Sequence, residues 1–249
     1  MRDMVVVAAK YHSRQASTAE DLRAAQVLRH RAFHGDKIGP ALDRDQFDAH
    51  CAHILVEEAE NGRLVCCFRI LHLAHGRDIE RTYSAQFYDL SALHEFDGPI
   101  VEIGRFCVDP EVGDVDVLRV AWAAMTRYVD AHGVRLLFGC SSFQGTDADA
   151  YCDAFALLKD RHLAPQNWLP RPKAPSVFRF AERLRRRKPD MKQAMLRMPP
   201  LLRTYLMMGG WVSDHAVVDR QMNTLHVFTG LEIAAIPAMR KRLLRADAE

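Results

Sequence analysis

The sequence predicts an α/β (α+β) fold in which a mixed central sheet is flanked by helices. Two observations carry this prediction. Strand-like and helix-like stretches alternate over the first two thirds of the chain, an order typical of a sheet covered by helices. An Asn61-Gly62 pair joins two apolar runs within residues 53–73 and marks a β-hairpin, so at least one strand pair is antiparallel. We therefore expect a sheet that contains both kinds of pairing.

The first elements follow from residue pattern. A short β-branched run predicts a strand over 4–11. Apolar residues at helical spacing predict a helix over 17–34, and Ser17 with Glu20 forms a capping box at its start. Gly, Pro and several Asp predict a loop over 35–52, before the hairpin.

The later elements alternate again. Residues 84–93 could form a short helix, and the helix expected over 116–132 is stopped by Gly133. The other expected elements are a strand over 99–108, a buried strand over 134–143 and a helix over 147–162. After residue 165 the pattern weakens and prolines become frequent. We expect residues 1–165 to form the core and residues 166–249 to form a helical C-terminal extension packed on it.

Composition excludes several classes of protein. The chain is 49% hydrophobic and 27% charged with a formal net charge of +2, so no global charge favours nucleic acid. Several of the six cysteines lie inside apolar runs and no CxxC pair occurs, which indicates buried, reduced thiols and no metal site. The N-terminal apolar run is too short for a signal peptide or a membrane span. We expect a cytoplasmic protein, with peripheral contact at the inner membrane left open.

Two opposite charges interrupt the apolar strand "VEIGRFCV". Glu102 and Arg105 are three residues apart, so they point to opposite faces of a regular strand. A bulge at Gly104 would turn both to one face. The pair is then either an ion pair or a catalytic set, in which Glu102 meets a reacting amine and Arg105 fixes carboxylates.

A second candidate is the acidic loop "LDRDQFDAH". Asp43, Asp45 and Asp48 crowd together, and like carboxylates need a cation or solvent to be tolerated. The spacing does not match an EF-hand loop. Arg29, Arg31 and Arg69 from neighbouring elements are the expected partners, and a solvated acidic loop is the alternative.

Two further segments are chemically distinctive. "GCSSFQGTD" follows a buried strand, so its backbone amides, Ser141 and Ser142 could meet a ligand, although it does not match GxSxG. The stretch 183–192 is rich in basic residues, including Arg185, Arg186, Arg187 and Lys188. Such a patch suits an acidic partner, either protein or lipid.

Taken together, an ordered set of segments resembles the ornithine lipid synthase N-acyltransferase family. The segments are "LRHRAF", "DRDQFDAHCAHILV", "LVCCFRIL", "FYDL", "VEIGRFCVDPE" and "LFGCSSFQGTD", followed by "MPPLLRTYLMMGGWVSDHAVVDRQMNTLHVF". The resemblance implies a GNAT-like acyltransferase core over 1–165. It implies transfer of a 3-hydroxy fatty acyl group from acyl carrier protein to the α-amino group of ornithine, which forms lyso-ornithine lipid, a step in bacterial membrane lipid synthesis.

The same resemblance, extended to the related acyl-homoserine lactone synthases, implies site residues. Arg29 and Phe33 match a pair on the first helix, Asp45, Phe47 and Asp48 match an Asp-x-Phe-Asp loop, Arg69 matches a strand arginine, and Glu102 and Arg105 match a Glu-x-x-Arg pair. These residues are implied to line the amine and acyl-donor cleft, with Glu102 and Arg105 as the catalytic pair and the others, with Ser141 and Ser142, as substrate-binding residues.

Two departures from related enzymes bear on donor and acceptor. The loop "PEVGDVDVLR" has one glycine and three acids where coenzyme A-dependent GNAT enzymes cradle a pyrophosphate. This departure favours acyl-phosphopantetheine on acyl carrier protein, without another cofactor, and the basic residues 185–188 would dock that acidic partner. Ala52 stands where many relatives carry Asp, so glutamine or another amino acid stays an alternative acceptor.

Two alternatives of other kinds remain open at this stage. A non-enzymatic protein could bind anionic membranes through the basic stretch and the Met-rich "TYLMMGGW" segment. An acyl-homoserine lactone synthase would use S-adenosylmethionine, but "HGDKIGPAL" lacks the tryptophan that such enzymes carry after the first helix.

Overall fold

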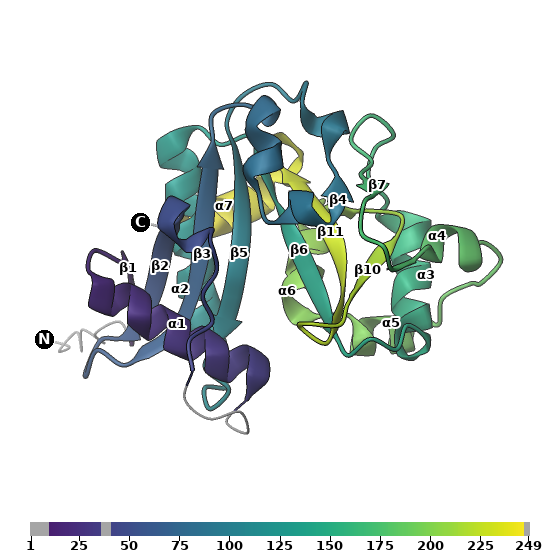
Figure 1. Ribbon diagram of the computed structural model, residues 1–249. Coiled ribbons are helices and arrows are strands. Elements are labelled where there is room, and N and C mark those ends of the chain that lie inside the picture. Colours follow the sequence, from purple (N-terminus) through teal and green to yellow (C-terminus); the bar gives the residue numbers. More distant parts are fainter. Residues whose placement is uncertain (1–9, 36–40, 247–249) are drawn as a thin grey trace, which may run out of the picture. The chain divides into compact units, whose positions relative to one another are not determined.

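The computed structural model describes residues 10–35 and 41–246, which form two compact units (Figure 1). The first unit holds the described residues of Met1–Ile70, Arg105–Ala131 and Arg242–Glu249. The second unit holds Leu71–Gly104 and His132–Lys241. Strands β3 (Leu64–Leu73) and β5 (Ile100–Val108) contribute residues to both units.

In the first unit an antiparallel ladder joins β1 (Tyr11–Gln15), β2 (Ala52–Glu58) and β3. Gly62 lies in the β2–β3 turn with a φ of 72°, a conformation that glycine adopts without steric cost. The predicted hairpin is therefore confirmed. Most of the strand expected over 4–11 lies outside the described residues, and the described strand begins at Tyr11.

Two helices complete the first unit. Helix α1 (Ala19–His34) begins one residue later than expected: Thr18 is the N-cap, and its capping-box partner is Asp21. The Ser17–Glu20 box is wrong because Asp21 also accepts hydrogen bonds from the Ser17 and Thr18 amides and from the Arg14 guanidinium. Helix α2 (Val115–His132) is followed by Gly133 at a φ of 59°, as predicted.

The second unit is built around strand β6. β6 (Leu136–Gln144) pairs in parallel with Ile100–Glu102 of β5 and antiparallel with β11 (Thr224–Glu232). A β-carbon on Gly139 would lie 2.4 Å from the Ile103 carbonyl oxygen, so only glycine permits this approach of β5 and β6.

The sheet of the second unit continues beyond β11. β10 (Ala216–Asp219) pairs with β11, and β8 (Val177–Phe178) pairs with β10. β9 (Trp211–Val212) also pairs with β11.

Four helices of the second unit supply one apolar cluster. They are α3 (Cys152–Arg161), α4 (Phe180–Arg183), α5 (Met191–Arg197) and α6 (Pro200–Met207). Phe155 and Phe180 stack with ring centroids 5.1 Å apart, and Ala194 and Leu202 are buried in the same cluster. The last helix, α7 (Ala238–Ala246), spans the boundary of the two units.

The helix expected over 84–93 is wrong. The chain instead forms short 3₁₀ turns at Ser84–Gln86 and Ser91–Leu93 on either side of β4 (Tyr88–Asp89). β4 pairs with β7 (Arg171–Pro172). The Asp89 carboxylate accepts a hydrogen bond from the Ser91 amide, a local turn that competes with helix formation.

The α/β fold class, with helices flanking a mixed sheet and a helical C-terminal end, is confirmed. Strands β7 to β11 were not expected after residue 165, and β11 pairs with β6 along its whole length. The boundary between the two compact units does not fall at residue 165. Whether residues 166–249 are an extension of a separately folding core stays a prediction. Among the described helices, none combines the length and apolarity needed to cross a bilayer.

Candidate active site

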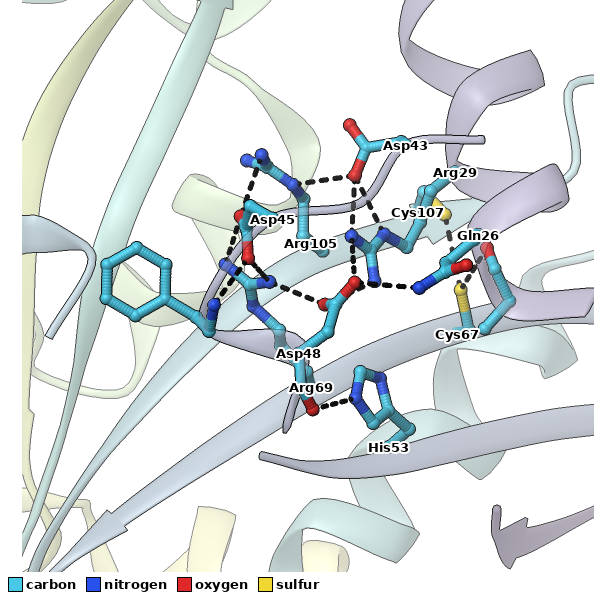
Figure 2. Close-up of polar contacts among 12 residues, drawn as sticks. Gln26, Arg29, Asp43, Asp45, Asp48, His53, Cys67, Arg69, Arg105 and Cys107 are labelled. Atoms are coloured by element: carbon cyan, nitrogen blue, oxygen red, sulfur yellow. Dashed lines mark hydrogen bonds and ion pairs between the residues drawn. The ribbon is translucent and has the colours of Figure 1, made fainter. Parts of the chain in front are cut away.

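Three arginines and three aspartates of the first unit form a closed ring of ion pairs (Figure 2). Arg29 comes from α1, Arg69 from β3 and Arg105 from β5. Around the ring the closest contacts are Arg29–Asp43 at 2.6 Å, Asp43–Arg105 at 2.9 Å, Arg105–Asp45 at 3.1 Å, Asp45–Arg69 at 2.6 Å, Arg69–Asp48 at 2.7 Å and Asp48–Arg29 at 2.9 Å. Each guanidinium thus bonds two carboxylates, and each carboxylate bonds two guanidiniums.

Burial explains why the ring is closed. The side chains of Arg29, Arg69 and Asp48 are only 1%, 3% and 6% exposed. Buried charges cost several kcal/mol each unless they are paired and hydrogen-bonded, so an unbalanced cluster here would be strongly unfavourable. The ring carries no net formal charge and so meets that requirement.

The ring fixes the ionisation of its carboxyl groups. Burial alone would raise the pKa of Asp48, but hydrogen bonds and charges from Arg29 and Arg69, with a hydrogen bond from Gln26, lower it to about 2. The pKa of Asp45 is lowered in the same way by Arg69 and Arg105. Both groups are therefore carboxylates at neutral pH.

Neighbouring groups hold the ring in place. The Phe47 amide donates to Asp45 Oδ1 at 2.9 Å, and the Phe47 ring lies 5.6 Å from the Arg69 guanidinium carbon. His53 Nε2 lies 2.9 Å from the Asp48 carbonyl oxygen, and burial lowers the pKa of His53, so its ring is neutral and donates this bond. The expected substrate residue Phe33 is half-buried against the apolar cluster of Ala25 and Leu28.

The backbone irregularity of β5 lies at Arg105. Arg105 has a φ of 51°, in the left-handed region that non-glycine residues seldom adopt, whereas Gly104 does not. The unusual backbone conformation thus lies one residue after Gly104, where a bulge was expected. Such a conformation persists where the surroundings enforce it, and the bonds from Arg105 to Asp43 and Asp45 supply that constraint.

Glu102 lies in the second unit and has its own set of partners. Its side chain is buried, with 5% of the residue exposed. The carboxylate accepts hydrogen bonds from the Tyr83 amide at 2.8 Å, the Ser84 amide at 2.7 Å and the Ser84 hydroxyl at 2.6 Å. Ser84 Oγ also lies 3.4 Å from Cys140 Sγ. Glu102 is thus a buried carboxylate held by the turn at residues 83–84.

The two serines of β6 differ in environment. Ser141 is buried, and its hydroxyl accepts a hydrogen bond from Thr229 Oγ1 at 2.9 Å. Ser142 is exposed and pairs with His226 of β11. Successive residues of a strand point to opposite faces, so the two hydroxyls cannot act on one ligand together.

The structure brings together six of the predicted site residues: Arg29, Asp45, Phe47, Asp48, Arg69 and Arg105. Asp43 belongs to the same ring but was not among the expected substrate-binding residues, although its spacing from Asp45 and Asp48 indicated it. The expected role of Arg31 as a partner of the acidic loop is wrong. Arg31 binds Asp109, because residues two apart on a helix point to nearly opposite sides.

Sequence reasoning missed Gln26, Tyr83 and Ser84. Gln26 lies one helical turn before Arg29 and donates to Asp48 at 3.0 Å, so helical spacing could have found it. Tyr83 and Ser84 act mainly through backbone amides, which no side-chain pattern reveals.

The basic residues 185–188 lie in a non-helical segment after α4. Arg185, Arg186 and Lys188 are exposed, whereas Arg187 also pairs with Asp153 at 3.0 Å. The Lys159 ammonium donates to the carbonyl oxygens of Leu184 and Arg187 at 2.8 and 3.0 Å. These contacts fix the backbone of the segment, so its basic side chains project into solvent.

Residues 28–123 match the family model described as Acetyltransferase (GNAT) domain. The chain is 32% identical to the L-ornithine N(alpha)-acyltransferase of Rhodobacter capsulatus over 246 residues, 94% of each chain. It is 29% identical to the enzyme of that name from Brucella abortus, over 90% of this chain and 84% of the relative. A solved CoA-dependent acyl-homoserine lactone synthase has a similar fold, with a TM-score of 0.50 and 13% identity over 97% of this chain and 90% of that chain.

These findings define an acyltransferase with a GNAT-like fold that transfers an acyl group to an amino group. The chain belongs to the L-ornithine N(alpha)-acyltransferase family. The alternative of a non-enzymatic lipid-binding protein is therefore wrong.

Proposed function

We propose that this protein transfers a 3-hydroxy fatty acyl group from acyl carrier protein to the α-amino group of ornithine, forming lyso-ornithine lipid in the cytoplasm. The observation that carries this proposal is the 32% identity to an L-ornithine N(alpha)-acyltransferase along 94% of both chains. No cofactor is needed beyond the phosphopantetheine arm that carries the acyl group.

We assign the role of base to Glu102. An α-amine is mostly protonated near neutral pH, so a proton must leave before nitrogen can attack a thioester carbon. A buried carboxylate held by three hydrogen bonds is fixed in position, and it can accept that proton directly or through one water. The amine then bonds to the thioester carbon, the C–S bond breaks, and the nitrogen gives up a second proton. The pantetheine sulfur takes up one proton and leaves as a thiol. Backbone amides near Gly104–Phe106 are our candidate donors to the oxyanion.

The ring of ion pairs has a different role in this proposal. All three guanidiniums are engaged by aspartates, so the ring acts by fixing the structure of the first unit. It holds the 43–48 segment and fixes the left-handed backbone at Arg105. Arg105 is then a positioning residue for the catalytic strand.

The start of α2 supports acyl carrier protein as the donor. Glu111, Asp114 and Asp116 crowd the segment that precedes and opens this helix, and Glu111 is 70% exposed. Each of these acids is paired with a cation, Glu111 with Arg63, Asp114 with Lys10 and Asp116 with Arg119. The segment therefore holds little excess positive charge for a coenzyme A pyrophosphate. A carrier-protein phosphopantetheine brings only one phosphodiester. The exposed Arg185, Arg186 and Lys188 suit an acidic carrier protein.

Glutamine is the second candidate acceptor. Position 52 is alanine, where we expect an aspartate in many relatives, so one carboxylate that could contact the cationic side chain of ornithine is missing. Asp43, Asp45 and Asp48 each already bond two arginines, so the ring offers little extra negative charge to a cation. Both observations favour a neutral amide as an alternative side chain.

The test is a direct assay. Purified protein is incubated with 3-hydroxypalmitoyl acyl carrier protein and either ornithine or glutamine, and the products are identified by mass spectrometry. Lyso-ornithine lipid is expected. If only the glutamine product forms, glutamine replaces ornithine as the proposed acceptor. If folded protein forms no product from either amino acid, the proposal is overturned.

A further inference from the structure

Large exposed apolar side chains are concentrated on the last three helices. Of the eight such residues in the described chain, six lie on α5, α6 and α7. They are Met191, Met195, Leu196, Met207, Met239 and Leu243, with exposures from 38% to 77%. Scattered single apolar residues are ordinary on a protein surface, but a concentration of this kind indicates a binding surface.

The same helices carry only positive charge. The sequences of α5, α6 and α7 contain seven basic residues and no Asp or Glu. They are Lys192, Arg197, Arg203, Arg240, Lys241, Arg242 and Arg245. Because the whole chain has a formal net charge of +2, the remainder has a net charge of −5. These helices therefore carry a local excess of positive charge, in which Arg245 is paired with Asp130.

Two contacts join the helices into one surface within the second unit. Arg203 of α6 donates to the Met195 carbonyl oxygen of α5 at 3.5 Å. Arg240 of α7 lies 3.8 Å from Met207 Sδ of α6. Met195, Met207 and the start of α7 are thus neighbours. We call the exposed residues of α5, α6 and 238–241 at the start of α7, all in the second unit, the C-terminal surface.

Little of this surface serves the protein core. Ala194 is the buried residue of α5, and no described side chain of α7 is buried. Met239, at the start of α7, is 77% exposed. These apolar side chains are available to a partner outside the chain.

We propose that the C-terminal surface docks the enzyme on a membrane that contains anionic lipids. Helices with Lys and Arg beside exposed apolar residues lie in the bilayer interface, with apolar side chains in the headgroup–acyl boundary and basic groups near lipid phosphates. The sequences of α5, α6 and 238–241 contain no acid, which suits a surface of uniform negative charge better than the defined charge pattern of one acidic protein. The docking follows from this surface and does not depend on the acceptor amino acid. The product of the proposed reaction is amphiphilic, so an enzyme docked on a membrane could release it there.

The test is sedimentation of the full-length protein with lipid vesicles in the absence of substrates. Vesicles of phosphatidylcholine alone are compared with phosphatidylcholine that contains phosphatidylglycerol. We expect about tenfold or greater enrichment on the anionic vesicles, and its loss at high salt. Leu196→Ser, Met207→Ser and Met239→Ser together should reduce binding by about tenfold or more.

A matched control and an enzyme assay separate the alternatives. Val27→Ser with Val115→Ser removes the two other exposed apolar residues and should leave vesicle binding unchanged. Failure of the folded wild-type protein to bind anionic vesicles would overturn the proposal. The proposal would also be overturned if the triple variant binds vesicles normally but has a higher KM for the acyl carrier protein thioester, because the surface would then dock that protein. Vesicle binding requires no turnover, so its outcome is independent of the proposed reaction.

Discussion

At the scale of residues, the ion-pair ring is the most constrained feature of the candidate site. Arg29, Arg69 and Arg105 come from three different elements, and all meet the short acidic segment 43–48. Removal of one carboxylate leaves two buried guanidiniums short of an anion. The energetic effect of one substitution should therefore exceed that of an ordinary surface ion pair.

Asp48→Asn should lower the free energy of unfolding by about 3–5 kcal/mol, the range for breaking a buried pair. Asp48 bonds Arg29, Arg69 and Gln26, and an amide removes the negative charge at unchanged size. Urea denaturation measures the change. Asp116→Asn, which breaks the exposed pair with Arg119, is the control and should cost less than about 1 kcal/mol. Equal effects in the two variants would contradict a structural role for the ring.

The ring also predicts acid sensitivity. The folded-state pKa of Asp48 is about 2, below its ordinary value of 3.8. A depressed carboxyl pKa contributes stability that is fully present above about pH 4 and is lost as the pH falls through about 2. The difference in unfolding free energy between the wild type and Asp48→Asn should therefore shrink over this interval. Urea midpoints across the interval measure it, and a constant difference would exclude Asp48 as the titrating group.

Glu102→Gln should lower turnover by about 10²–10⁴-fold if Glu102 is the base. The amide cannot take a proton from the amine, and its NH₂ group would face one of the two backbone amides at Tyr83 and Ser84. Turnover is measured against pH, because loss of a base alters the profile whereas a displaced turn lowers it uniformly. Glu111→Gln, at an exposed glutamate, is the control. If the folded Glu102→Gln variant keeps near-normal turnover, Glu102 is not the base.

Sequence reasoning reached most of the ring but not the partners of Glu102. The ring could be predicted from the sequence because a charged residue inside an apolar strand needs a partner of opposite charge. Arg69 within β3 is an example. Tyr83 and Ser84 bind Glu102 through backbone amides, which any residue possesses. The serines of β6 were grouped by adjacency, but strand geometry separates them.

At the scale of elements, short sequence motifs correctly predicted the turns and helix ends that depend on a few neighbouring residues. Asn61-Gly62 and Gly133 occupy a turn and a helix end that require a positive φ at glycine, and both boundaries were found. Strands β7 to β11 were missed because most are short and are defined by distant partners, as in the β8–β10 pair. The Asp89 turn likewise overrides the helical pattern of residues 84–93.

The junction of β5 and β6 depends on one glycine. Gly139→Ala should destabilise the protein by about 1–3 kcal/mol, because the new β-carbon would lie 2.4 Å from the Ile103 carbonyl oxygen. This junction also carries Glu102, which pairs with Phe138, so turnover should fall as well. Gly113→Ala is the matched control, since nothing lies within 4 Å of its added β-carbon. Thermal unfolding of both variants measures the difference, and equal melting temperatures would refute the close approach.

At the scale of the whole molecule, charge is distributed unevenly over a chain that is nearly neutral. The net charge of +2 conceals exposed cations at 185–188 and on the last helices, and an acidic segment at the start of α2. Total charge therefore gave no argument for nucleic acid and indicated no other partner. The exposed cations at 185–188 underlie our proposal that an acidic carrier protein is the donor, and this proposal can be tested through binding and turnover.

Arg185→Glu, Arg186→Glu and Lys188→Glu together should raise KM for acyl carrier protein thioester by about tenfold or more and leave kcat nearly unchanged. Rim charges steer association and contribute little to the chemical step. Arg187 is left intact because it pairs with Asp153. The same acyl group on N-acetylcysteamine has no protein to dock, so its kinetics should not change. Reversal of three other exposed arginines, Arg23, Arg77 and Arg81, controls for net charge. If both triple variants raise KM equally, the effect belongs to total charge and the docking site lies elsewhere.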